Sequence, residues 1–370
     1  MNSFPRRRFA FRLAALALAL AAAPAFASDD DSSLREGKVF TSTNATGNNE
    51  LLVFAPAATG DLALLARIAT NGQGTGAGLG SQGAVTLSGD GRHVFVVNAS
   101  SNTVSTFAIR GTAIVLTSVV DSGGLHPISV TEYDGIVYVL NAGGAGNVAG
   151  FRNQQGELRP LPDGSRGLSA AGGTNPAQVG FGADGEVLVV TEKATARITS
   201  FPVRRDGTLG TAVVTASSGA TPFGFAFDRR DHLIVSEAPG SAASSYRFDE
   251  RTAAATLISA SVPNTQAAAC WVAVTPNGRY AYTANAGSST LSSYRIGRSG
   301  QLELASAVAG STGLNAGALD ITVSPDGRRL FAIASRSLQI VSFRVGHDGN
   351  LTTLGAGAGL PAGFAGIAAN

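Results

Sequence analysis

A repeat of 43 to 55 residues runs through the chain from residue 39 onward. Each copy contains a turn, a short apolar strand and a small or polar residue, as GDGRHVFVVNA and PNGRYAYTANA show. Seven copies align on the apolar strand, which begins at residues 39, 94, 137, 187, 233, 281 and 330. Periods of this length are typical of propellers and of helical arrays, so the elements within each copy decide between them.

Each copy contains four extended segments. In the second copy they are GAVTLS, HVFVVNA, TVSTFAI and AIVLTSVV, which are rich in β-branched and aromatic residues and are bounded by Gly, Asp or Asn. Beyond the N-terminal leader described below, no part of the chain carries a sustained helical period, which excludes a helical array. We therefore predict an all-β fold, a seven-bladed β-propeller with four antiparallel strands per blade.

The end of the chain supplies a strand that the first copy lacks. Residues 362–370, AGFAGIAAN, resemble the innermost strand of the other copies, whereas the first copy starts near Lys38 without one. Pairing of this segment with residues 39–43 would leave no long strand edge open. We predict that the C-terminal strand joins blade one and closes the ring.

The N-terminal segment is typical of an exported protein. Four arginines at 6–8 and 12 precede the apolar run LAALALALAAA and an A-x-A cleavage site that ends at Ala27. The run is shorter than the roughly 20 residues of a membrane span, which disfavours an anchor. We predict a signal peptide over 1–27, an acidic linker over 28–37, a propeller domain over 38–370 and a periplasmic or secreted location. The arginines also fit the twin-arginine signal loosely, so the export route stays open.

The charge of the mature chain argues against two classes of partner. Removing the four arginines of the leader from 27 basic residues leaves 23, against 25 acidic ones. No basic footprint remains for nucleic acid, and no later segment is apolar for long enough to span a membrane. The single Cys270 cannot form an intrachain disulfide, so stability must come from a large core. We expect a monomer that binds a small molecule.

The predicted blade gives the ring two different faces. Turns such as GDGR join first strands to second strands on one face, here called the turn face. The ends of the second strands and the loops that enter the first strands form the other, here called the loop face. We expect the loop face to carry a ligand funnel. Its polar residues are Asn98, Asn141, Glu192, Lys193, Glu237, Asn285 and Arg336 after the second strands, with Gln82, His126, Gln178, Trp271 and Asp320 near the first strands.

Several site types lack the residues they require. Three of the four histidines, His93, His232 and His347, fall at turns on the turn face, so a zinc site of three histidines cannot form around His126. The Gly-rich segment GQGTGAGLG lacks the lysine of a phosphate-binding loop. We predict no metal site and no cofactor, although a calcium ion bound by backbone carbonyls would leave no motif.

The repeated pattern D/N-G-R-x-x-Y/F-V-x-N resembles the seven-bladed lactonase-type propeller family, which includes phosphogluconolactonase and carboxymuconate cyclase. The resemblance covers the mature chain, which looks like a member of a secreted bacterial branch of this family. It implies an activity that opens or closes a lactone. Members of the family carry an Arg-His pair where this chain has Cys270 and Trp271, and a further histidine near Ala177. The catalytic residues of the family therefore cannot be transferred one by one.

Three hypotheses for function follow. In the first, an exported enzyme hydrolyses or forms a lactone or ester of a small organic acid, with Glu192 or Glu237 as general base and Lys193 or Arg336 stabilising the oxyanion. In the second, a non-catalytic propeller binds a small molecule or glycan. In the third, its faces dock an envelope protein. Residues expected to bind the ligand are Asn98, His126, Asn141, Gln178, Trp271 and Asn285. Asparagine also forms turns, so a purely structural role stays open for these amides.

Overall fold

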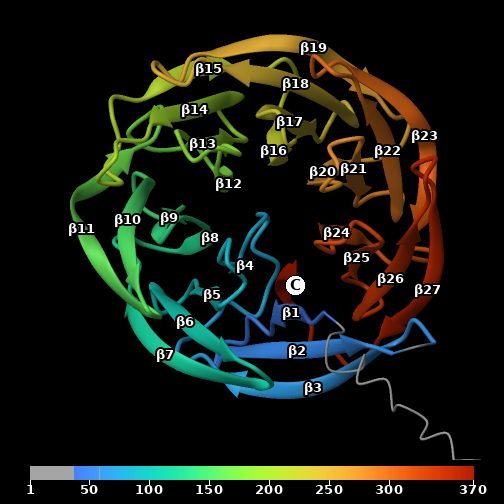
Figure 1. Cartoon of the computed structure of the whole chain (residues 1–370), viewed down its shortest axis with the longest axis horizontal. Coiled ribbons are helices and arrows are strands. Elements are labelled where there is room, and N and C mark those ends of the chain that lie inside the picture. The colour runs from blue at the N-terminus through green and yellow to red at the C-terminus, as the bar shows by residue number, and fades with distance from the viewer. Residues whose placement is uncertain (1–36, 58) are drawn as a thin grey trace, which may run out of the picture. The chain divides into compact units, whose positions relative to one another are not determined.

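The computed structural model describes residues 37–57 and 59–370. The predicted signal peptide over 1–27 and the linker up to residue 36 lie outside the described residues. Seven four-stranded antiparallel sheets surround a central channel, with one strand of each sheet next to the channel and one at the rim (Figure 1). The predicted seven-bladed β-propeller is confirmed. The described residues include no apolar helix of membrane-spanning length.

Each blade runs from the channel to the rim in chain order, except that blade one takes its innermost strand from the C-terminus. Blade one contains β28 (Ala365–Ala369), β1 (Val39–Ser42), β2 (Glu50–Pro56) and β3 (Leu62–Ala69). Blade two contains β4 (Val85–Leu87), β5 (His93–Asn98), β6 (Thr103–Arg110) and β7 (Ala113–Asp121). Blade three contains β8 (Pro127–Tyr133), β9 (Ile136–Asn141), β10 (Asn147–Gln154) and β11 (Glu157–Gly167).

The remaining blades repeat this arrangement. Blade four contains β12 (Pro176–Phe181), β13 (Val187–Glu192), β14 (Arg197–Pro202) and β15 (Val213–Ala216). Blade five contains β16 (Pro222–Phe227), β17 (His232–Glu237), β18 (Ala242–Phe248) and β19 (Ala255–Pro263). Blade six contains β20 (Ala269–Val274), β21 (Tyr280–Asn285), β22 (Thr290–Ile296) and β23 (Leu302–Ser311). Blade seven contains β24 (Ala318–Val323), β25 (Arg329–Ala334), β26 (Gln339–Val345) and β27 (Leu351–Gly357).

The C-terminal strand closes the ring, as the sequence predicts. β28 pairs antiparallel with β1, with Val39 opposite Ala369. The Thr41 hydroxyl donates a hydrogen bond of 2.6 Å to the carbonyl of Gly366, and the Lys38 N–H donates one of 2.6 Å to the side chain of Asn370. The two ends of the described chain therefore stabilise one sheet, and β1 has no open inner edge.

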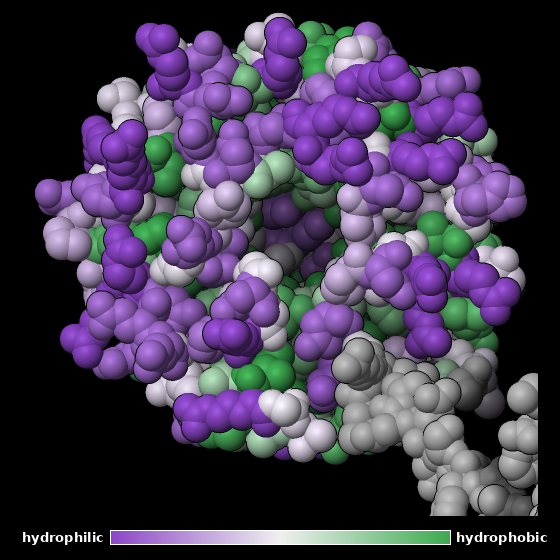
Figure 2. Space-filling view, viewed as in Figure 1, coloured by the Kyte–Doolittle hydropathy of each residue, from purple (hydrophilic) through white to green (hydrophobic). Residues whose placement is uncertain are grey.

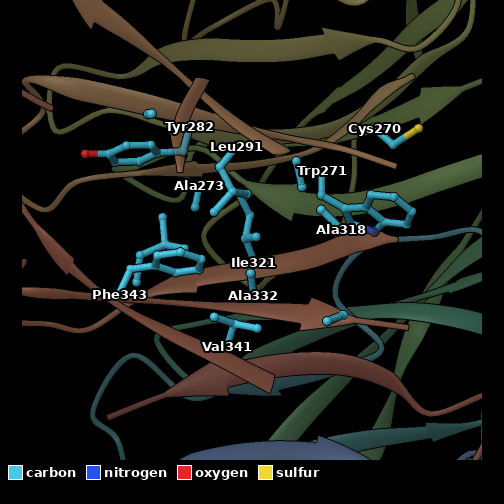
Figure 3. Close-up of a cluster of buried hydrophobic side chains, with 14 of the residues drawn as sticks. Cys270, Trp271, Ala273, Tyr282, Leu291, Ala318, Ile321, Ala332, Val341 and Phe343 are labelled. Atoms are coloured by element: carbon cyan, nitrogen blue, oxygen red, sulfur yellow. The ribbon is translucent and has the colours of Figure 1, made fainter. Parts of the chain in front are cut away.

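The core lies between neighbouring blades. Second strands such as β9 and β13 are buried along their whole length, because adjacent sheets cover both of their faces. Rim strands such as β19 have no fully buried residue and are half-buried or exposed along their length. One core cluster joins Tyr282 and Leu291 of blade six to Phe343 of blade seven (Figure 3). This difference explains why the second strands give the clearest apolar repeat in the sequence.

A bulge recurs in the first strands of five consecutive blades. The pairing of the first with the second strand shifts register between Pro127 and Ser129 in blade three, and the first strands of blades four to seven shift at the corresponding place. A bulge adds a residue to one strand and redirects its side chain. The residues at these bulges include Gln178, Trp271 and Asp320, each two positions after the first residue of its strand, so they occupy equivalent positions in blades four, six and seven.

Candidate functional site

Residues 79–83, here called the strap, cross the channel immediately before β4. Figure 1 shows that the chain leading into β4 reaches closer to the centre of the ring than the first strands of the other blades. Hydrogen bonds attach the strap to three other blades: Ser81 Oγ donates to Ile128 O at 2.8 Å, Gln82 N to Ala177 O at 3.1 Å, and Trp271 Nε1 to Ser81 O at 2.8 Å. The strap therefore covers the channel at its loop-face end.

The channel forms a cavity of about 590 Å³ on the other side of the strap. Figure 2 shows hydrophilic residues around a central hollow on the visible face of the ring. First strands form the walls, and turn-face residues form the mouth. The inner end is lined by Gln82, Gly83, Gln178 and Asp320, and the mouth by Ala183, Arg229 and Pro276. A concave site with a few polar groups at one end is typical of small-ligand binding.

Asp320 is a buried carboxyl group at the inner end of this cavity. Only 4% of the residue is exposed. Burial raises the pKa of Asp320 to about 8, and the backbone N–H groups of Gly83 and Ile321 oppose that rise. The Gly83 N–H lies 3.4 Å from Asp320 Oδ2. The ion pairs among the described residues do not include Asp320. A carboxyl group that titrates close to neutral pH can exchange a proton with a ligand.

Two side-chain amides lie at the same end of the cavity. Gln178 Oε1 accepts a hydrogen bond of 2.7 Å from Phe225 N, and its Nε2 donates one of 3.0 Å to Phe225 O. Gln82 makes the same pair of bonds with Val272, at 3.0 and 2.7 Å. Both glutamines thus pair with the free edge of another blade's first strand. Each NH2 group has two N–H donors, and one remains for a ligand.

The position of the Gln82 side chain requires a glycine at residue 224 in blade five. A Cβ atom at Gly224 would lie 2.2 Å from Gln82 Oε1 and 2.7 Å from the carbonyl oxygen of Cys270. Real Cβ atoms do not come this close to other atoms. The absence of a side chain at Gly224 therefore allows the strap and the first strand of blade six to meet at the channel axis.

The comparisons with known proteins agree with this geometry. The family described as Lactonase, 7-bladed beta-propeller matches residues 145–271, 233–318 and 251–365 in overlapping segments. The chain belongs to this lactonase family. The predicted resemblance is therefore confirmed, and the family match extends from blade three to the closing strand.

Solved structures show the same fold as this lactonase-family propeller. The periplasmic gluconolactonase of Pseudomonas aeruginosa is 15% identical with a TM-score of 0.69, covering 89% of this chain and 98% of the other. Candidate 6-phosphogluconolactonases from Bacteroides uniformis and Bacteroides fragilis are each 18% identical with TM-scores of 0.71. They cover 90% and 93% of this chain and 99% of their own. No curated protein sequence matches the chain significantly. Identities this low establish the fold alone.

The predicted asparagines of the lactonase-family propeller lie between blades. Asn98 is fully buried; its Oδ1 accepts hydrogen bonds from Asn49 Nδ2 at 3.0 Å and Thr70 Oγ1 at 2.8 Å, both in blade one or the loop after it. Asn285 makes the equivalent bond with Asn264, and Asn141 donates to the carbonyl of Ser122. In each case the side chain attaches the end of a second strand to the loop that leaves the preceding blade. These hydrogen bonds fit the structural role that the sequence left open, and ligand binding by these amides stays a prediction.

The two predicted carboxylates occupy the corresponding position in blades four and five. Glu192 is fully buried and accepts hydrogen bonds from Ser169, Thr195 and Thr199, whereas Glu237 accepts them from Gly219 and Ser261. Neither lines the channel cavity. Because a general base must face its substrate, the catalytic role of Glu192 or Glu237 stays a prediction without support from this geometry.

The other predicted residues lie at the loop face. Lys193 Nζ donates a hydrogen bond of 2.5 Å to the carbonyl of Gly80 and lies 4.8 Å from the ring centre of Phe223; burial lowers its pKa. Arg336 is exposed. His126 has a positive φ of 57°, and its backbone N–H donates a hydrogen bond of 2.7 Å to the side-chain oxygen of Asn102. Of all predicted site residues, Gln178 is the one that lines the described cavity.

Two of the three positions that the resemblance points to, Trp271 and Ala177, bond to the strap. Cys270 and Trp271 are 7% and 6% exposed, and the carbonyl of Ala177 accepts a hydrogen bond from Gln82. Burial raises the pKa of the Cys270 thiol to about 11, so the thiol stays protonated at neutral pH. The loop-face end thus lacks a free base at these positions.

Asp320 and Gln82 received no role from the sequence, although both were placed near the first strands. A signal was present, because Asp320 is a charged residue inside the apolar strand ALDITV.

Exposed carboxylates of Asp184, Glu186 and Glu250 come within 4.8 Å of one another at the turn face. They lie outside the group that forms the inner end of the cavity, and exposed acidic groups commonly meet without an ion. We assign no metal to them.

Proposed function

We propose that this lactonase-family propeller hydrolyses a small lactone bound in the channel cavity, with Asp320 as the group that accepts and returns the proton. The proposal is supported by one observation above all. A carboxyl group with no cationic partner among the described residues lies at the inner end of a cavity, beside two side-chain amides that each keep an N–H donor. Membership of the family favours a lactone as the ligand.

The residues suggest how ring opening would proceed. The Asp320 carboxylate accepts a proton from water as the water oxygen bonds to the lactone carbonyl carbon. The carbonyl oxygen becomes an oxyanion, and the free N–H groups of Gln82 and Gln178 stabilise it. The bond from this carbon to the ring oxygen then breaks, and the proton returns from Asp320 to the departing oxygen. The product is an open hydroxy acid, and Asp320 is a carboxylate again.

The solved structures suggest a substrate class. One is named a periplasmic gluconolactonase, and two are named as candidate 6-phosphogluconolactonases. We therefore propose a lactone of a sugar acid as the first substrate to test. The predicted signal peptide over 1–27 supports a location outside the cytoplasm, where the substrate would be an extracytoplasmic sugar lactone.

Hydrolysis of sugar lactones by residues 28–370 tests the proposal. Acid release from D-glucono-1,5-lactone and related lactones is followed in a pH-stat and corrected for spontaneous opening. We expect Asp320→Asn to lower kcat at least 100-fold with the fold retained by circular dichroism. Glu192→Gln is the matched carboxylate control and should keep most of the activity. Loss of activity in Glu192→Gln alone would move the site to the second-strand ends.

One observation favours a second candidate function. The positions of the family's Arg-His pair hold Cys270 and Trp271, which are both buried, and Trp271 bonds to the strap. A propeller without that pair could bind a sugar acid in the cavity without turning it over. In that case gluconate raises the melting temperature, Asp320→Asn removes the shift, and no lactone is hydrolysed faster than in buffer.

A further inference from the structure

We propose that the strap, residues 79–83, determines which ligands the channel accepts, because it closes the loop-face end and leaves the turn-face mouth as the route to the cavity. The strap also supplies Gln82 and Gly83 to the inner end, so its position sets the depth of the cavity. The inference rests on the proposed function for the identity of the ligand alone. The closure itself concerns access to the channel and can be measured without turnover.

The strap extends across the channel rather than along one wall. It leads into the first strand of blade two, yet its hydrogen bonds reach blades three, four and six. The Gly83 N–H also points to Asp320 in blade seven, at 3.4 Å. Contacts with four blades on different sides of the axis require the chain to cross that axis. A ligand moving from the loop face would have to displace these bonds.

Two glycines of the strap allow this crossing. Gly80 and Gly83 have φ values of 60° and 83°, in a backbone region that residues with a Cβ atom rarely adopt. A Cβ at Gly83 would lie 3.0 Å from the Ser129 hydroxyl. The preceding residues, GQGTGAGLG over 72–80, make the segment between blades one and two long enough to reach the axis. The Gly-rich segment thus has a structural use that differs from phosphate binding.

Lys193 holds the strap at the loop face. Its ammonium group donates to the Gly80 carbonyl at 2.5 Å and lies over the Phe223 ring, so it connects the start of the strap to blades four and five. Lys193→Met keeps the apolar stem of this side chain and removes the donor. Arg336→Met is the matched control, because Arg336 is an exposed cation on the same face with no described bond to the strap.

Cys270 reports on closure because it is the single cysteine of the chain and is 7% exposed beside Trp271, which bonds to the strap. We compare the rate of alkylation of Cys270 by iodoacetamide in native protein, Lys193→Met and Arg336→Met. We expect at least a tenfold faster reaction in Lys193→Met and less than a twofold change in Arg336→Met. The nearby Lys193 charge lowers the pKa of Cys270, so its removal alone would slow alkylation. Acceleration therefore indicates that the strap opens.

Two further variants keep the test decisive. Ser81→Ala removes the bond to Ile128 and should also accelerate Cys270 alkylation, even if Lys193→Met is poorly folded. Thr322→Cys in a Cys270→Ser background places a thiol inside the cavity. It should react at least tenfold faster than native Cys270, and Lys193→Met should leave its rate unchanged. Equal rates on both sides of the strap, or no acceleration in either strap variant, would overturn the proposal.

Discussion

Gln82 and Val272 are 190 positions apart in the sequence, and the side chain of Gln82 pairs with both the N–H and the C=O of Val272 across the channel. The first strand of each blade has an inner edge that no other strand covers, so its backbone groups need other partners. Gln178 makes the same pair of bonds with Phe225 in the neighbouring blade. The channel is therefore held together by side-chain amides that act in place of a strand.

Gln82→Ala should destabilise the fold because it leaves the Val272 N–H and C=O unpaired in a buried place. We expect a loss of about 1 to 3 kcal/mol in the free energy of unfolding, measured by urea denaturation. Gln154→Ala removes a glutamine that is exposed at the end of β10, and it should change stability by less than about 0.5 kcal/mol. Equal effects at the two positions would contradict a role for the Gln82 amide.

Gly224→Ala should displace Gln82, because the new methyl group would lie 2.2 Å from Gln82 Oε1. We expect a destabilisation of roughly 1 to 3 kcal/mol, as for other overpacked buried sites. A Cβ at Gly240 would meet no atom closer than 3.9 Å, which makes Gly240→Ala the matched control. Thermal melts of both variants, with the Gln82→Ala variant as reference, show whether Gly224→Ala acts through the same contact.

The architecture follows from the sequence because it depends on local patterns. The seven buried second strands repeat every 43 to 55 residues, and residues 362–370 match the one strand that blade one lacks. The site depends instead on the direction in which a polar side chain points at a strand end. Asn98 and Gln178 are both polar residues near the loop face, yet Asn98 faces the preceding blade, whereas Gln178 lines the cavity beside a bulge.

The bulges and the strap explain why the sequence predicts the architecture but not the site. A bulge adds one residue to a strand without altering its apolar character, so the periodic pattern does not locate it. The strap did leave a signal, because the first spacing between copies, from residue 39 to residue 94, is the longest of the six. The direction of the extra residues across the channel depends on contacts with Ala177 and Trp271, which lie far away in the sequence.

Asp320 should make stability fall as the pH rises. Its pKa is about 8 in the folded chain and 3.8 for an unperturbed aspartate, so the unfolded chain binds fewer protons than the folded one between these values. The stabilisation is complete below about pH 4 and is lost as the pH rises through 8. Asp320→Asn lacks this titration. The free energy of unfolding of the variant, relative to that of the native protein, should therefore rise by several kcal/mol from pH 4 to pH 9. Parallel stability curves from urea denaturation would contradict a buried, titrating Asp320.

Glu192 should contribute to stability through its hydrogen bonds. Glu192→Ala leaves the Ser169 N–H and the Thr199 hydroxyl without their acceptor, and we expect a loss of about 1 to 3 kcal/mol. Glu192→Gln keeps the shape and one carbonyl acceptor, so its loss should be smaller. The two variants also test the catalytic hypothesis in the lactone assay. A structural Glu192 predicts that activity per folded molecule stays constant in both, whereas a general base predicts that Glu192→Gln is inactive though stable.

Removal of the closing strand should open the ring. A chain that ends at residue 364 lacks β28, which exposes the inner edge of β1 and removes the bonds that Thr41 and Ser42 donate to the carbonyls of Gly366 and Ala365. An unpaired strand edge favours association with other chains. We expect a lower melting temperature and concentration-dependent aggregation in light scattering. Deletion of Asn370 alone removes its two hydrogen bonds with Lys38 but keeps β28, and it should leave the chain as dispersed as the full-length protein. If the longer truncation stays equally stable and dispersed, the other six blades must hold the ring without the pairing of its ends.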